Sequence, residues 1–149
     1  MNPFDIKAAL LAKHAQHVVL IHFPIALFIA GVVFDFLAQK TKKRGLLEAA
    51  YYNLLGAAIF AVPAVVTGIL AWQFQLEGQK LKGILLMSVV LGSTSTILIW
   101  VAWALHVCTR RHWPKGLPVF RLVLETAALL IVGLTGHLGG FRSGVNGPS

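Results

Sequence analysis

The chain has 149 residues, of which 57% are hydrophobic and only 12% are charged, and its mean hydropathy is +0.77. Soluble domains carry about 25% charged residues, so this composition excludes an ordinary soluble domain and predicts an integral membrane protein. The net charge of +8 does not indicate a nucleic-acid partner, because the basic residues occupy short connectors between apolar segments. The partners we expect for them are anionic lipid headgroups.

Residues 1–16 place apolar side chains at helical spacing between lysines, which predicts a short N-terminal helix lying at the membrane interface. Four apolar runs follow, and at about 1.5 Å rise per residue each is long enough to cross the hydrocarbon layer. These runs are residues 18–38, 49–72, 83–107 and 118–138. The predicted fold class is therefore an all-α membrane protein, with a bundle of four transmembrane helices over residues 17–141 and a tail over residues 142–149.

The basic residues are unequally divided between the two sides of the membrane, and this division predicts the orientation. One side carries Lys40, Lys42, Lys43, Arg44, Arg110, Arg111, Lys115 and Arg121. The other side carries Lys7, Lys13, Lys80, Lys82 and Arg142. The first side has the excess, so we expect the first and third connectors in the cytoplasm and both termini outside, in the periplasm of a bacterial inner membrane.

Small and hydroxyl side chains within the spans indicate how the helices pack. The second span has glycines and alanines at small-xxx-small spacing, with Pro63 near its middle as a predicted kink. The third span carries the run GSTST over residues 92–96, at mid-membrane depth. Its hydroxyls are expected to bond carbonyls of their own helix or of a neighbour. A polar lining for a cofactor edge or a narrow water path is the alternative.

Six histidines occur, and their depths divide them between the two faces of the membrane. His17 begins the first span, and His22 lies about 7.5 Å further along it. The fourth span returns the chain to the same side, so His137 in its last turn is expected at nearly the same level. His17 and His22 point about 140° apart on a helix and therefore do not clamp one small ion together.

Imidazoles at matched depth on two facing helices are typical of a haem held between the spans of a bundle. We therefore predict His22 and His137 as axial ligands of haem b, with His17 at the mouth of the site. The sequence has no CxxCH motif, which excludes covalent c-type attachment. Two alternatives stay open, which are another metal such as copper or zinc, and histidines that only pack or contact lipid.

Two carboxylates lie towards the inner side and need partners, because a charge inside a span is costly. Asp35 is close in depth to His106 and Arg110, and we predict a structural ion pair of Asp35 with one of them. A carboxylate that admits protons or binds quinone is the alternative for Asp35. Glu125 has Arg121 four residues earlier on the same helix face, and we expect this arginine to pair with it while reaching towards the interface.

The stretches HVVLIHFPIALFIAGVVFD and TGHLGGFRSGV resemble the bacterial membrane proteins of domain-of-unknown-function family 2231, which have an HPxxVHFPIAL-like opening and a TGxxGG-like ending. His17 and His22 match the opening, whereas Val18 replaces its proline and His137 falls at a position that the motif leaves variable. The resemblance implies four membrane helices, associated in some members with redox or cytochrome domains. It implies no established activity.

The sequence has no GxSxG, HExxH or glycine-rich phosphate motif, so we expect a non-catalytic subunit rather than a stand-alone hydrolase or kinase. The predicted function is a b-haem-binding or quinone-linked electron-transfer subunit that works with a redox partner or a larger membrane complex. The alternatives are a cofactor-free structural or assembly subunit and a membrane protein that handles copper or zinc.

Overall fold

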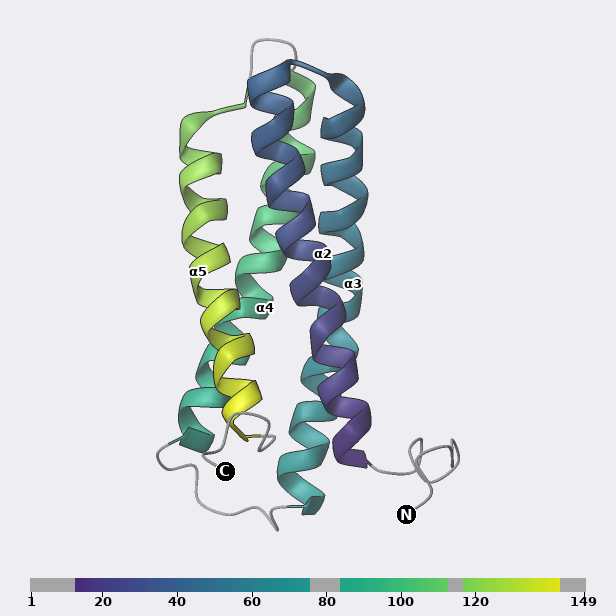
Figure 1. Cartoon of the computed structure of the whole chain (residues 1–149), viewed down its shortest axis with the longest axis vertical. Helices are drawn as coiled ribbons and strands as arrows, with labels where there is room; N and C mark the ends of the chain where they lie inside the picture. Colours follow the sequence, from purple (N-terminus) through teal and green to yellow (C-terminus); the bar gives the residue numbers. More distant parts are fainter. Residues whose placement is uncertain (1–12, 76–83, 113–116, 143–149) are drawn as a thin grey trace.

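The computed structural model describes residues 13–75, 84–112 and 117–142, and they form four long helices in an up-and-down bundle (Figure 1). The helices are α2 (Lys13–Thr41), α3 (Arg44–Gln75), α4 (Ile84–Thr109) and α5 (Val119–Arg142), with a short 3₁₀ helix η1 (Arg110–His112) after α4. The predicted all-α four-helix membrane fold is confirmed.

Each helix contains a segment long and apolar enough to cross a membrane, and these segments follow the predicted spans closely. They are Leu20–Thr41, Arg44–Ile69, Val89–Thr109 and Val119–His137. The N-terminal interfacial helix was predicted over residues 1–16. Its first twelve residues lie outside the described part of the chain, and α2 already includes the other four. Most of the predicted tail, residues 143–149, also lies outside it.

A tight turn joins α2 to α3 at one end of the bundle, which we call the turn end. Lys42 directly follows α2 with a φ of 56°, and its backbone N–H donates to the carbonyl of Ala38 at 2.8 Å. This left-handed residue closes the last helical turn and reverses the chain. Arg44 then begins α3 and lies 3.6 Å from Glu48 in an exposed i, i+4 ion pair. The turn sets α2 and α3 side by side along their length (Figure 1).

Small residues let α2 and α3 approach closely. Ala57, Ala58 and Ala61 are buried in the core of the bundle, and an added Cβ on Gly31 would lie 2.9 Å from Cγ of Leu54. That distance is too short for two carbon atoms, so only glycine fits at position 31 without movement of its neighbour. The small residues of the second span therefore serve packing within the chain, as the sequence indicates.

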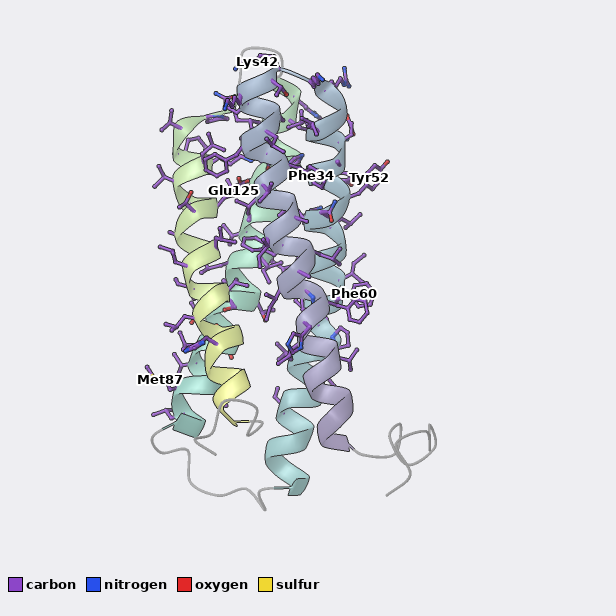
Figure 2. The ribbon with its side chains drawn as sticks, viewed as in Figure 1. Phe34, Lys42, Tyr52, Phe60, Met87 and Glu125 are labelled. Carbon is purple, nitrogen blue, oxygen red and sulfur yellow. The ribbon has the colours of Figure 1, made fainter. Side chains whose placement is uncertain are left out.

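The outer face of the bundle is apolar, as lipid contact requires. Tyr52 and Phe60 point away from the bundle on α3, whereas Glu125 points into it (Figure 2). Phe60 also stacks on Phe23 of α2, with ring centroids 5.5 Å apart. These features support association with a lipid bilayer.

An apolar core separates two groups of polar side chains, one nearer the turn end of the bundle and one nearer the opposite end. It is formed by Phe28, Val32, Leu54, Ala57, Ala58, Ala61, Ile99, Ala102, Ala128 and Val132. Further from the turn end, the hydroxyls of Ser95 and Thr135 are 2.7 Å apart and link α4 to α5. Thr94 and Thr96 donate instead to carbonyls of their own helix, at 2.7 Å and 2.9 Å. Nearer the turn end, the core meets a group of charged residues.

Candidate functional site in a buried charge cluster

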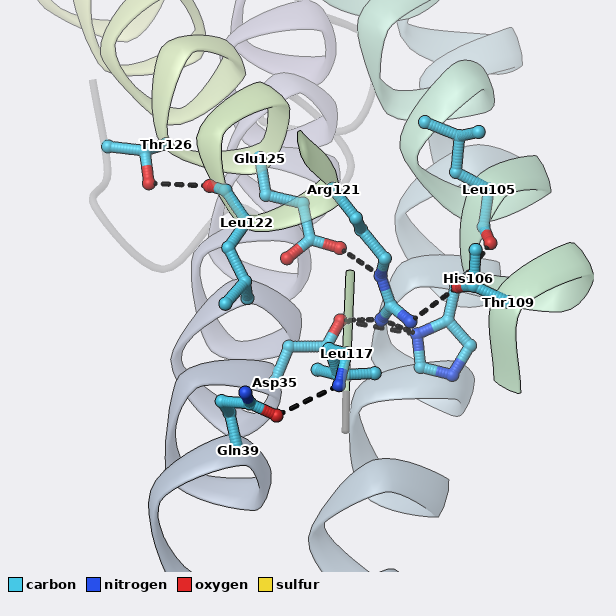
Figure 3. Close-up of polar contacts among 10 residues, drawn as sticks. All are labelled: Asp35, Gln39, Leu105, His106, Thr109, Leu117, Arg121, Leu122, Glu125 and Thr126. Atoms are coloured by element: carbon cyan, nitrogen blue, oxygen red, sulfur yellow. Dashed lines mark hydrogen bonds and ion pairs between the residues drawn. The ribbon is translucent and has the colours of Figure 1, made fainter. Parts of the chain in front are cut away.

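Four ionisable side chains from three helices meet inside the bundle near the turn end (Figure 3). Asp35, His106, Arg121 and Glu125 each have 0% exposed surface. We call these four residues the buried charge cluster. Charged side chains at membrane depth are rare and tend to be functional, because each must be paired or face a polar cavity.

The helical periodicity of the sequence explains why these residues face inward. On α2, Phe28, Val32 and Asp35 follow a spacing of four and three residues, so Asp35 continues the buried apolar stripe. On α5, Arg121 and Glu125 are the first members of the stripe that Ala128 and Val132 continue at the same spacing. The charges therefore occupy positions that the fold requires to be internal.

Arg121 is the centre of the cluster. Its Nε donates to Oε1 of Glu125 at 2.8 Å, and its Nη1 donates to Oγ1 of Thr109 at 3.0 Å. Its Nη2 contacts both Oδ2 of Asp35 and Nδ1 of His106. One guanidinium thus joins α2, α4 and α5, as a planar fork of five donors allows.

Asp35 and His106 also contact each other, with Oδ2 and Nδ1 3.2 Å apart. The sequence predicted His106 or Arg110 as the ion-pair partner of Asp35, but the arginine that contacts Asp35 is Arg121. Arg110 is exposed, and its guanidinium lies over the ring of Tyr51 at 4.5 Å from the centroid. Arg121 pairs with Glu125 but does not reach towards the interface, because its side chain is fully buried.

The cluster holds polar atoms without a hydrogen-bond partner among the described residues. They are Oδ1 of Asp35, Nε2 of His106 and Oε2 of Glu125, and Nε1 of Trp103 is a fourth such atom nearby in the core. Buried polar atoms are normally paired, because leaving one unpaired costs roughly 1–3 kcal/mol. Two carboxylates and one guanidinium carry one net negative charge, which one further proton on the cluster neutralises. This arrangement suits a group that exchanges protons or binds a polar ligand.

A shallow apolar groove of about 400 Å³ lies on the lipid-facing side of α2 and α5, next to the cluster. It is lined by Phe36, Val119, Leu122, Val123, Thr126, Ala127 and Leu130. Phe36 follows Asp35 in the chain, and Leu122 and Thr126 flank Glu125 on α5. Figure 3 shows the second carboxylate oxygen of Glu125 on the Leu122 side, away from Arg121. Leu122, one helical turn before Glu125, is half-buried and lines the groove.

His22 and His137, which the sequence predicts at the same depth, lie near the end of the bundle opposite the turn end. The side chains of His22 and His137 are exposed. A Cβ added to Gly136 would lie 3.3 Å from Cδ1 of Ile25, so the helix segments bearing the two histidines pack together. His17 belongs to α2, but its side chain lies outside the described part of the structure.

The described residues contain no group of three histidine, cysteine, aspartate or glutamate side chains arranged to hold a metal ion. A haem needs only two axial ligands, and His22 and His137 lie on suitable neighbouring helices. However, the contact between Gly136 and Ile25 leaves no width for a porphyrin between α2 and α5 at that level. Haem therefore fits between these helices only if they separate near this end.

Sequence reasoning missed the central position of Arg121 and the place of Tyr51 beside His106. The i, i+4 spacing of Arg121 and Glu125 predicts that they form an ion pair. No sequence pattern predicts the contacts of Arg121 with α2 and α4. The ring of Tyr51 lies 5.8 Å from that of His106, centroid to centroid. Tyr51 carries no charge and its position resembles that of an ordinary interfacial tyrosine.

Comparison with known proteins agrees with the membrane fold. A family model described as a predicted membrane protein (DUF2231) matches residues 13–145. No curated protein and no solved structure matched the chain. The family match covers the four helices and both of the motifs that the sequence shares with this family. The chain therefore belongs to the DUF2231 family of predicted membrane proteins.

Proposed function

We propose that the protein is a quinone-linked subunit of a membrane redox system, in which the buried charge cluster binds and exchanges protons with a quinone head group. The observation that carries the proposal is that Oε2 of Glu125 is fully buried without a partner among the described residues, one helical turn from Leu122, which lines an apolar groove. Electrons come from a redox partner of the same complex, since the chain offers no redox-active motif of its own.

The chemistry of a quinone matches both parts of this site. Its ring and isoprenoid tail are apolar and suit a groove lined by valine, leucine and phenylalanine side chains. A quinol hydroxyl donates a hydrogen bond to a carboxylate, and a protonated carboxyl group donates to a quinone carbonyl. Glu125 can fill either role, while Arg121 holds its other oxygen at 2.8 Å. Rotation of Leu122 is the movement that brings the head group to Glu125.

Photolabelling tests this proposal. The protein is placed in nanodiscs and irradiated with an azido-benzoquinone that carries an isoprenoid tail, and the labelled peptides are mapped by mass spectrometry. We expect labelling on the first half of α5 that excess unlabelled quinone removes. Leu122→Trp fills the groove and should lower labelling at least fivefold. Glu125→Leu should also lower it, because leucine offers the quinone carbonyl no hydrogen-bond donor.

Leu134→Trp is the matched control, because Leu134 is an exposed leucine of the same helix outside the groove. Its labelling should equal that of the wild type. Labelling that unlabelled quinone does not remove, or that phospholipid removes equally well, would contradict the proposal. The cluster would then serve to join α2, α4 and α5, which favours a cofactor-free structural or assembly subunit.

A haem b subunit is the second candidate function, supported by the place of His22 and His137 on neighbouring helices near the same end of the bundle, where α2 and α5 must separate to admit a porphyrin. When bound, haem supplies one-electron transfer, and the two imidazoles are the residues that would hold it. The test is the visible spectrum of protein expressed with added haem and reduced with dithionite. We expect an α-band that both His22→Ala and His137→Ala abolish or shift. A spectrum without haem bands, or one that neither change alters, would exclude this ligand pair.

A further inference from the structure

The buried charge cluster has one aromatic neighbour at the turn end. Tyr51 of α3 is half-buried, and its ring lies against His106 with the centroids 5.8 Å apart and the planes inclined by 42°. Arg110 is exposed at the end of α4 and covers the ring of Tyr51 at 4.5 Å. A cation over an aromatic face is attractive, so Arg110 holds this ring in place. The two side chains therefore form a layered cover over His106, with the exposed Arg110 outermost.

In the direction of the opposite end, Nε1 of Trp103 is an isolated polar atom in the apolar core, without a partner among the described residues. Phe28 and Val32 of α2, Ile99 of α4 and Val132 of α5 are buried together there, with exposed fractions of 3% or less. The next polar contact between described helices is that of Ser95 with Thr135. A close-packed apolar layer with one isolated N–H group does not conduct protons, because it offers no continuous chain of donors and acceptors. Towards the turn end, Ala38, Leu47 and Leu117 form a second buried apolar group, whereas the half-buried Tyr51 contacts His106 directly. The geometry therefore favours proton access on the side of Tyr51 and Arg110.

We propose that Tyr51, held by Arg110, is the cover through which the buried charge cluster exchanges protons with the aqueous phase at the turn end. The use of this route rests on the proposed function, since quinone chemistry requires protons at the cluster. The route depends only on Tyr51, Arg110 and His106, and it exists whether or not quinone binds.

His106 is the group that receives the proton. Titratable and charged groups surround it from every helix that packs on it, with Asp35 on α2, Tyr51 on α3, and Arg121 with Glu125 on α5. When a proton from water binds Nε2, the imidazole can release the proton of Nδ1 to Oδ2 of Asp35, 3.2 Å away. One proton enters and one leaves, so the charge of the imidazole is unchanged. Without the Nδ1 proton, Nδ1 accepts from Arg121 instead.

Reaction with diethyl pyrocarbonate measures access to His106, because the reagent modifies unprotonated imidazoles that it can reach. Trypsin cleavage after Lys82 and Arg110 yields a peptide in which His106 is the only histidine. In nanodiscs, we expect slow modification of His106 in the wild type and at least tenfold faster modification in Tyr51→Ala. Tyr51→Phe keeps the covering ring and should stay within twofold of the wild type.

Arg110→Gln removes the cation that holds the ring and should raise the modification rate severalfold. Arg111→Gln is its matched control, because Arg111 is the adjacent exposed arginine, and it should leave the rate unchanged. Circular dichroism and the modification rate of His137 show whether each variant keeps its fold. If Tyr51→Ala does not fold, the comparison of the His106 modification rates in Arg110→Gln and Arg111→Gln tests the proposal.

A wild-type rate at His106 in both folded Tyr51→Ala and Arg110→Gln would overturn the proposal. It would equally be overturned if Leu122→Ala, which opens the groove, accelerated modification while Tyr51→Ala did not. Neither result depends on quinone labelling. Failure of the cover and failure of the quinone site are therefore distinguishable.

Discussion

Arg121→Met should be the most damaging single substitution in the bundle. The change leaves Asp35 and Glu125 buried with two carboxylates and no guanidinium, and it removes the contacts that join α5 to α2 and α4. Removing one partner of a buried ion pair typically costs about 3–5 kcal/mol, because the remaining charge stays in a medium of low polarity. We expect a loss of that size in the free energy of unfolding, measured by denaturant titration in mixed micelles.

Arg111→Met is the control for Arg121→Met, because Arg111 is exposed at the turn end and should tolerate the same change with little effect. A combined variant with Asp35→Asn, Arg121→Met and Glu125→Gln removes every fixed charge of the cluster. It should recover much of the stability that Arg121→Met loses. If Arg121→Met unfolds as the wild type does, Arg121 is not the centre of this cluster.

Asp35→Leu is expected to have the second largest effect. The substitution removes the carboxylate oxygen that Nη2 of Arg121 and Nδ1 of His106 both contact, and a hydrogen bond to a charged group contributes roughly 1.5–3 kcal/mol. Asp35→Asn should cost less than half as much. The asparagine keeps a carbonyl oxygen at the same place, and the cluster then balances one guanidinium against one carboxylate. Unfolding in mixed micelles measures both.

Gln39→Leu provides the comparison for Asp35→Leu on the same helix. Oε1 of Gln39 accepts one neutral hydrogen bond, from the backbone N–H of Leu117 at 2.9 Å. Its loss should cost about 1 kcal/mol. The variants Asp35→Leu and Arg121→Met should also be non-additive, because they remove the same contact. If Gln39→Leu and Asp35→Leu lower the free energy of unfolding equally, the charge of Asp35 contributes nothing to stability.

The fold could be predicted from the sequence because lipid imposes simple rules on it. A membrane span must be apolar for about 20 residues, and its backbone must be helical to satisfy its hydrogen bonds. These two conditions locate all four helices. Two helices begin five residues before their predicted spans, α2 at Lys13 rather than near residue 18 and α3 at Arg44 rather than near residue 49. The exposed pair of Arg44 and Glu48 lengthens α3 beyond its apolar part.

The sequence predicts the depth of the site residues in the membrane, but not the direction in which their side chains point. The rise per residue places Asp35 level with His106, Arg110 and Arg121, and this is enough to expect a charged pair. Which side of α4 and α5 faces α2 depends on side-chain packing over the whole bundle. The sequence therefore could not choose between Arg110, which lies over Tyr51, and Arg121, which contacts Asp35. The role of Tyr51 depends on the same unknown rotation.

The position of the cluster above the apolar core has an electrical consequence. Asp35 lies six residues from the end of α2, or about 9 Å along its axis, whereas the apolar core separates it from the opposite end. Most of a transmembrane voltage falls across the apolar part. A proton that reaches the cluster from the turn end therefore crosses about a third of the field, or about 0.7 kcal/mol per 100 mV. One pH unit is worth about 1.4 kcal/mol, so proton binding should respond about twice as strongly to one unit of local pH as to 100 mV of membrane potential.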